Sequence, residues 1–207
     1  MAMWSITLPL LVGLFRYKRF TAVPKVVWYF VLVSTVFELV SGRIADLGDQ
    51  NTDFIPYFVA IETLFLSWVY RKTLDGVWKK IIVAALILIL ITSLISILSA
   101  SDSDTFSSNL RLVQTGVFIV LSLVYFYQLF DHVEIKALGK EPMFWFNTGF
   151  FIYFCGALFF FVASITPNGE EFIQEEIEFF HQLFIIHSLV MVIRNILLTI
   201  GFWRIPK

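Results

Sequence analysis

Long runs of apolar residues limit this chain to a few kinds of fold. Residues 81–98 contain no charged side chain, and residues 115–129 repeat the pattern further along the sequence. A run of about 18 or more apolar residues is long enough to cross the hydrocarbon core of a bilayer as a helix. Strands of a membrane barrel would be about ten residues long and would alternate between apolar and polar, which these runs do not. The sequence therefore predicts an all-α, polytopic membrane protein embedded in the lipid bilayer.

The composition supports this class and excludes several functions. Hydrophobic residues make up 58% of the chain and charged residues only 15%, whereas a soluble domain is about half apolar and a quarter charged. A net charge of -1 offers no basic surface for nucleic acid. The single cysteine, Cys155, cannot form an intramolecular disulfide. No nucleotide-binding or zinc-protease motif is present, so we expect no cofactor and no nucleic-acid partner.

Seven apolar segments predict a seven-transmembrane-helix bundle that forms one domain over residues 1–207. They cover residues 2–16, 24–42, 54–70, 77–99, 108–130, 143–164 and 178–203. The joining loops are too short for a soluble domain, so any function must lie in the bundle or on these loops. Pro9 interrupts the short first segment, and whether that segment spans completely stays open. Its positive charges follow the apolar stretch, which favours an uncleaved helix over a signal peptide.

The loops alternate in charge along the chain. Twelve of the 15 lysines and arginines fall on one side of the predicted membrane: Arg16, Lys18, Arg19, Lys25, Arg71, Lys72, Lys79, Lys80, Lys136, Lys140, Arg204 and Lys207. The other loops are acidic and carry Asp46, Asp49, Asp53, Asp102, Asp104, Glu170, Glu171, Glu175, Glu176 and Glu178. Positive loops stay in the cytoplasm. We therefore predict a multi-pass protein with an outside N-terminus and a cytoplasmic C-terminus.

Polar side chains inside the spans mark the candidate functional positions, because ionisable groups in lipid are costly. The candidates for ligand binding are Glu38, Glu62, Arg111, Gln114, His181, His187, Arg194 and Asn195. Their helical spacing places them on faces that should turn away from lipid. A rise of about 1.5 Å per residue places most of them in the outer half of the bundle. We expect a polar pocket there, with Glu62 facing inward and His187 as the first candidate for its partner.

Three interpretations of these residues stay open. They can form buried ion pairs and hydrogen bonds that only fix helix packing. They can line an outward pocket for a small-molecule or lipid ligand or an ion. They can form a metal-dependent hydrolase in which His181, His187 and Glu62 hold the metal. The two histidines are six residues apart and lie about 120° apart around a helix, so we expect neither a metal site nor catalytic residues.

Small residues recur in the sixth apolar segment. Gly149, Gly156 and Ala163 are spaced by seven residues. Small side chains let helices in a membrane approach closely. We interpret the stripe as a packing face between helices of one chain, and a homodimer face is the alternative.

Four segments carry a resemblance to a known family: FWFNTGFFIYFCGALFFF at 144–161, IIHSLVMVIRNILLTIGFW at 185–203, YFVAIETLF at 57–65 and LVYFYQLF at 123–130. Together they resemble an uncharacterised bacterial family of seven-span membrane proteins of about this length. The resemblance implies that the protein lies in a bacterial cytoplasmic (inner) membrane. Genes of that family lie near sensor kinases, so the resemblance implies a receptor-like signalling protein with a protein partner. We predict sensing or ligand binding. A membrane-embedded metal-dependent hydrolase and a small transporter are the alternatives, and an enzyme is the less favoured class.

Overall fold

The computed structural model describes residues 2–46, 55–98, 103–132, 135–163 and 174–206, and every regular element in these ranges is helical. The predicted all-α class is thereby confirmed for the described residues. Two short helices, α1 (Ala2–Ser5) and α2 (Thr7–Arg16), precede the long ones. The long helices are α3 (Ala22–Asp46), α4 (Ile55–Thr73), α5 (Trp78–Leu98), α6 (Ser103–His132), α7 (Pro142–Ala163) and α8 (Gln174–Arg204). The 3-10 turns η1 (Tyr17–Arg19) and η3 (Ile135–Lys140) lie between them.

Five of these helices are long and apolar enough to cross a membrane, which makes the chain an integral membrane protein. The candidate spans are Ala22–Ile44, Trp78–Leu98, Asn109–Asp131, Pro142–Val162 and His181–Arg204. The short α2 and the more polar α4 are not among them. A count of seven spans therefore stays a prediction.

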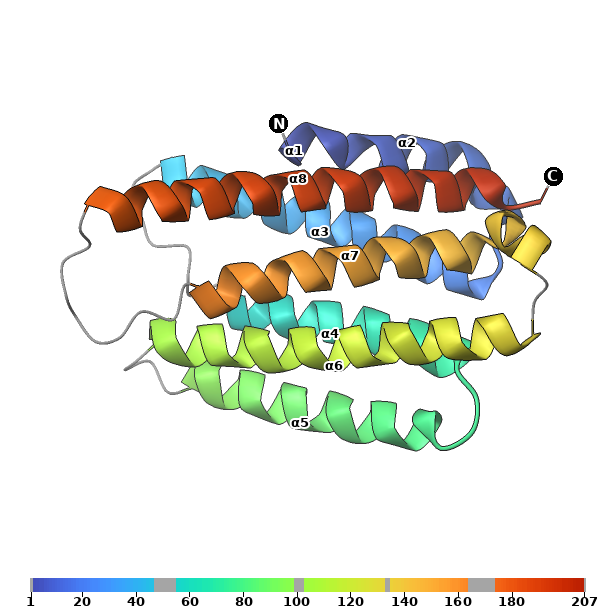
Figure 1. Ribbon diagram of the computed structural model, residues 1–207, viewed down its shortest axis with the longest axis horizontal. Helices are drawn as coiled ribbons and strands as arrows, with labels where there is room; N and C mark the ends of the chain where they lie inside the picture. The colour runs from blue at the N-terminus through green and yellow to red at the C-terminus, as the bar shows by residue number, and fades with distance from the viewer. Residues whose placement is uncertain (1, 47–54, 99–102, 133–134, 164–173, 207) are drawn as a thin grey trace.

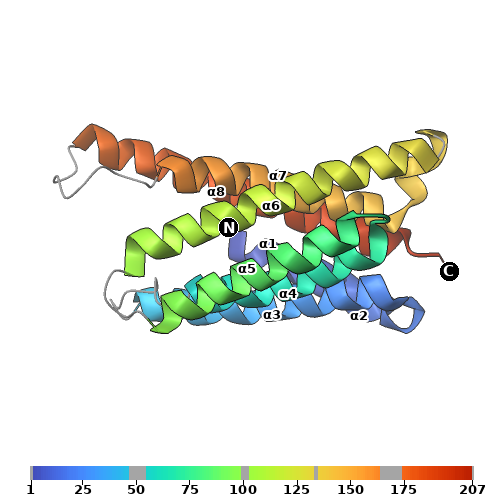
Figure 2. The same cartoon turned by 90° about the horizontal axis from the view of Figure 1, so that it is seen from below.

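The long helices form a bundle of two layers. Helices α6, α7 and α8 make one layer, and α2, α3, α4 and α5 make the other (Figures 1 and 2). The core between the layers is rich in aromatic rings, and Phe118 stacks on Phe154 with ring centroids 5.1 Å apart. Outward-facing side chains are large and apolar, as in Leu88 and Leu123, which are more than half exposed. Such a surface is stable only against lipid.

Most of the basic residues gather at one end of the bundle. The ends of α2, α4 and α8 lie together with the start of α5 on the right in Figure 1. We call this the basic end; its described members include Arg16, Lys18, Arg19, Arg71, Lys72, Lys79, Lys80, Lys140 and Arg204. The predicted grouping of the basic loops is thus present in the fold. Five of the ten acidic loop residues lie outside the described residues: Asp49, Asp53, Asp102, Glu170 and Glu171.

The N-terminal segment breaks at Ile6, and it covers only part of the bundle length (Figure 1). Pro9 supplies the physical reason, since it has no N–H to donate to the carbonyl four residues earlier and is tolerated only in the first turn of α2. At the other end of this segment, Arg16 donates to the carbonyls of Trp203 (2.8 Å) and Ile205 (3.2 Å). Trp203 lies in the last turn of α8 and Ile205 directly follows the helix, so neither carbonyl has a partner within the helix. The first segment is therefore fastened to the last helix.

The small-residue stripe of α7 packs against α8 of the same chain. A Cβ added at Gly149 would lie 3.3 Å from the carbonyl oxygen of Arg194, and one at Gly156 would lie 2.7 Å from Val190. The two helices approach closely because these positions lack a side chain. For Gly149 and Gly156, packing within one chain accounts for the spacing of seven. The side chain of Ala163 is not among those described.

Candidate functional site

An ion pair joins α4 and α6 in the half of the bundle away from the basic end. Glu62 is fully buried, and its Oε2 accepts a hydrogen bond from the Arg111 guanidinium. The same guanidinium nitrogen donates to Gln114 Oε1 over 2.7 Å. The Gln114 amide donates in turn to Thr63 Oγ1 (3.0 Å) and to the carbonyl of Val59 (3.1 Å). The expectation that Glu62 faces the interior and has a polar partner on another helix is confirmed.

A second group joins α8 to α3 and α1. Arg194 is 2% exposed, and its Nη2 lies 3.6 Å from Glu38 Oε1. Its Nε donates to Asn195 Oδ1 over 3.2 Å. The Asn195 amide then donates to Ser5 Oγ over 2.8 Å, which brings the first helix into the same site. Three of the predicted residues, from two distant segments of the chain, are thus in contact.

Tyr153 of α7 connects the two groups. Its hydroxyl accepts a hydrogen bond from Arg111 over 2.8 Å. The guanidinium carbon of Arg194 lies 4.5 Å from the centre of the Tyr153 ring, in cation–π geometry. We call the connected set the Tyr153 network; its members are Glu38, Glu62, Arg111, Gln114, Tyr153, Arg194 and Asn195. Two guanidinium groups and two carboxylates balance its formal charge.

Three buried polar atoms near this network have no hydrogen-bond partner among the described residues: Glu62 Oε1, His187 Nδ1 and Ser34 Oγ. Leaving a buried polar atom unpaired costs about 1–3 kcal/mol, and more for a charged group. Both Glu62 and His187 lie near Tyr153. Glu62 and Tyr153 each bind the Arg111 guanidinium, and the His187 ring lies 6.1 Å from the Tyr153 ring. Ser34 is one helical turn from Glu38 on α3. In native proteins most buried polar side-chain atoms have a partner, either a protein group or an ordered water.

The histidines depart from the sequence-based expectation. Glu62 pairs with Arg111 rather than with His187, whose ring instead stacks on Phe160 with centroids 5.0 Å apart. His181 is exposed, so the expected inward face of the last helix does not include it. The rise per residue placed His187 and Glu62 at one depth, but the rotation of each helix about its axis decides which groups meet. Within the described residues, no group of three histidine, cysteine or acidic side chains could hold a metal ion, and His181, His187 and Glu62 do not form one.

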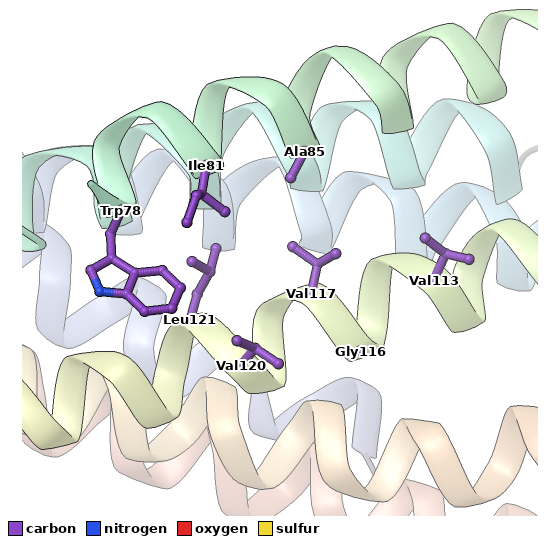
Figure 3. Close-up of a pocket in the computed structure, with 8 residues that line it drawn as sticks. All are labelled: Trp78, Ile81, Ala85, Val113, Gly116, Val117, Val120 and Leu121. Atoms are coloured by element: carbon purple, nitrogen blue, oxygen red, sulfur yellow. The ribbon is translucent and has the colours of Figure 1, made fainter.

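An apolar groove lies elsewhere, between α5 and α6 (Figure 3). The expected polar pocket would be lined by the network residues, yet none of them lines this groove. The network side chains pack on one another instead, with Arg111 covered by the rings of Phe58 and Phe161 at 5.2 and 5.7 Å. The structure therefore shows the predicted residues as a largely paired polar centre.

Sequence reasoning missed Tyr153 as the connecting residue, together with Ser5 and Thr63. A signal for Tyr153 was present, because it is the one tyrosine in the phenylalanine-rich run 144–161. A hydroxyl in that position needs a partner inside the bundle. The same reasoning would have found a second polar cluster toward the basic end. There, Tyr70 donates to Asn147 Oδ1 over 2.8 Å and lies 2.7 Å from Ser122 Oγ.

Comparison with family models, with curated proteins and with solved structures finds no match for this chain. The resemblance to a bacterial seven-span family therefore stays a prediction. The function has to be inferred from the residues of the Tyr153 network themselves.

Proposed function

We propose that the protein is a receptor-like membrane sensor whose Tyr153 network binds a small ligand from the side opposite the basic end. The observation that carries the proposal is the unpaired Oε1 of the fully buried Glu62 carboxylate. A carboxylate oxygen only accepts hydrogen bonds, so the missing partner is a donor. His187 Nδ1 offers a second unpaired atom near the same tyrosine.

The charge balance of the network indicates the class of ligand. Each guanidinium already faces one carboxylate: Arg111 faces Glu62, and Arg194 faces Glu38. A ligand with a net charge would leave one charge uncompensated in a medium of low dielectric. We therefore infer a ligand that is neutral overall, uncharged or zwitterionic, and carries an N–H or O–H donor for Glu62.

The connections of the network suggest how binding would become a signal. Its side chains come from α3, α4, α6, α7 and α8, and Ser5 adds α1. A ligand that donates to the unpaired oxygen of Glu62 adds a contact to a centre that joins these helices, and so favours the arrangement of the bundle in which that contact forms. The basic end, which the charge rule assigns to the cytoplasm, is where a signalling partner would detect the change.

Free glycine and betaine test this proposal as a matched pair of zwitterions. Glycine carries N–H donors, whereas betaine has the same charges and none. Both are small osmolytes, so subtracting the effect of betaine removes the general stabilisation by excluded solutes. Glycine is expected to raise the melting temperature of the purified full chain in a saturable manner, as a ligand that binds only the folded state does.

The variant His187→Phe keeps a ring against Phe160 and removes Nδ1. It is expected to fold and to show a smaller glycine-dependent shift than the wild-type chain. Equal melting temperatures in glycine and betaine for the wild-type chain would reject the proposal. A glycine shift unchanged in His187→Phe would reject the assigned site.

We further propose seven spans, with the N-terminus outside and the C-terminus in the cytoplasm of the inner membrane. Helix α4 supports this count, because its 19 residues rise by about 28 Å, close to the thickness of a bilayer core. Single cysteines introduced into a Cys155→Ala background are expected to react with an impermeant reagent on intact cells at Glu171 and not at Lys72. The reverse labelling would overturn the orientation.

A further inference from the structure

The groove between α5 and α6 is apolar and lies on the outside of the bundle. It has a volume of about 330 Å³ and is lined by Trp78, Ile81, Ala85, Val113, Gly116, Val117, Val120 and Leu121. Ile81 of α5 and Val113 and Val120 of α6 are 42 to 50% exposed. Gly116 widens the groove, since a Cβ added there would meet no atom within 4 Å. Its walls can only be stable in contact with another apolar group.

One end of the groove differs from the rest. Trp78 closes the groove at the basic end, and its indole ring lies beside Leu121 there (Figure 3). The indole N–H has no hydrogen-bond partner among the described residues, although tryptophan usually finds one at a membrane interface. Lys79 and Lys80 follow directly in the chain. Lys79 pairs with Asp75 over 3.0 Å, whereas Lys80 is exposed and has no ion pair within the described residues.

We propose that this groove binds an anionic phospholipid, with one acyl chain along α5 and α6 and the phosphate group at Trp78, Lys79 and Lys80. The arrangement matches an amphiphile, because the lining of the groove is apolar, while the Trp78 indole N–H and the neighbouring lysines lie beside its end at the basic end of the bundle. The apolar walls run for about 10–12 Å between Trp78 and Ala85 and between Leu121 and Val113. Charge complementarity favours an anionic head group over a zwitterionic one.

The test compares phospholipid retention by native mass spectrometry. The purified full chain is incubated in detergent with equal amounts of phosphatidylglycerol and phosphatidylcholine, and the bound lipids are counted by mass. We expect the wild-type chain to retain one phosphatidylglycerol in preference to phosphatidylcholine. The double variant Lys79→Gln/Lys80→Gln should lose this preference while still retaining lipid, because it removes only the head-group contacts.

The variant Gly116→Phe fills the groove and should weaken retention about tenfold or more, because the acyl chain loses its buried surface. The matched control is Ala84→Phe, which adds the same ring at an exposed position of α5 outside the groove. Both variants should fold, as judged by an unchanged melting temperature in lipid-free detergent. We expect Gly116→Phe to fold as well, because a Cβ added at Gly116 meets no atom within 4 Å.

Three outcomes would overturn the proposal. The first is equal retention by Gly116→Phe and Ala84→Phe. The second is equal binding of the two lipids by the wild-type chain, which would reject the anionic head-group site. The third is a dimer mass that disappears in Gly116→Phe, which would make the groove a contact between two copies of the chain.

Discussion

Arg111→Met is expected to lower the free energy of unfolding by up to about 3–5 kcal/mol, the range measured when one partner of a buried ion pair is removed from a soluble protein. Arg111 is 5% exposed and Glu62 is fully buried, so the variant leaves a buried carboxylate without its ion-pair partner. It also removes the donors to Gln114 and Tyr153. In detergent we expect the loss of unfolding free energy to lie near the lower end of this range, because the polar groups of the unfolded chain find new partners in the micelle. Thermal unfolding in detergent measures the effect.

The matched control is Arg71→Met, which makes the same change at an exposed position at the end of α4. It should alter stability by less than about 0.5 kcal/mol. The double variant Arg111→Met/Glu62→Leu should recover much of the loss, since replacing both members of a buried pair by apolar groups can be nearly neutral. If Arg111→Met were no less stable than Arg71→Met, the ion pair would not hold α4 to α6.

The positions of the helices along the chain could be predicted from the sequence, because hydropathy and the residues that favour helix ends indicate similar boundaries. The predicted segment 143–164 matches α7, Pro142–Ala163, since a proline is favoured in the first turn of a helix and is compatible with the start of a span. Helix α6 begins at Ser103, five residues before the predicted boundary at 108. Hydropathy marks the part of a helix that lies in lipid, and polar residues can continue the same helix beyond it.

The partners within the polar site did not follow from the sequence. Arg111 was a candidate, but the rise per residue placed it nearer the outer boundary than Glu62 and matched His187 to Glu62 in depth, so depth favoured the wrong partner. The choice depends on which helices are neighbours and how each is rotated, and α4 lies beside α6. Tyr153 was missed because the small residues Gly149 and Gly156 suggested only a packing role for its helix. In fact one face of α7 packs on α8 while Tyr153 joins both guanidinium groups.

Gly201→Ala is expected to cost about 1–3 kcal/mol of stability through overpacking. A Cβ at this buried position of α8 would lie 2.6 Å from Cδ1 of the Phe146 ring. Phe146 cannot give way easily, because it is fully buried and its ring centroid lies 4.9 Å from that of Phe202. Phe202 is itself stacked on Phe20, with centroids 5.2 Å apart. The added methyl group must therefore move rings that belong to α7, α8 and the segment before α3.

Gly116→Ala makes the same change in the middle of α6, where the new methyl group meets no atom within 4 Å. Alanine favours a helix over glycine by up to about 1 kcal/mol, so this control should be neutral or slightly stabilising. The difference in melting temperature between the two variants isolates the steric contact from helix propensity, because propensity favours alanine in both. If the Gly201→Ala chain were as stable as Gly116→Ala, α7 and α8 could move apart at the basic end without a loss of stability. The carbonyls of Trp203 and Ile205, which hold Arg16 there, would then not depend on close packing of these two helices.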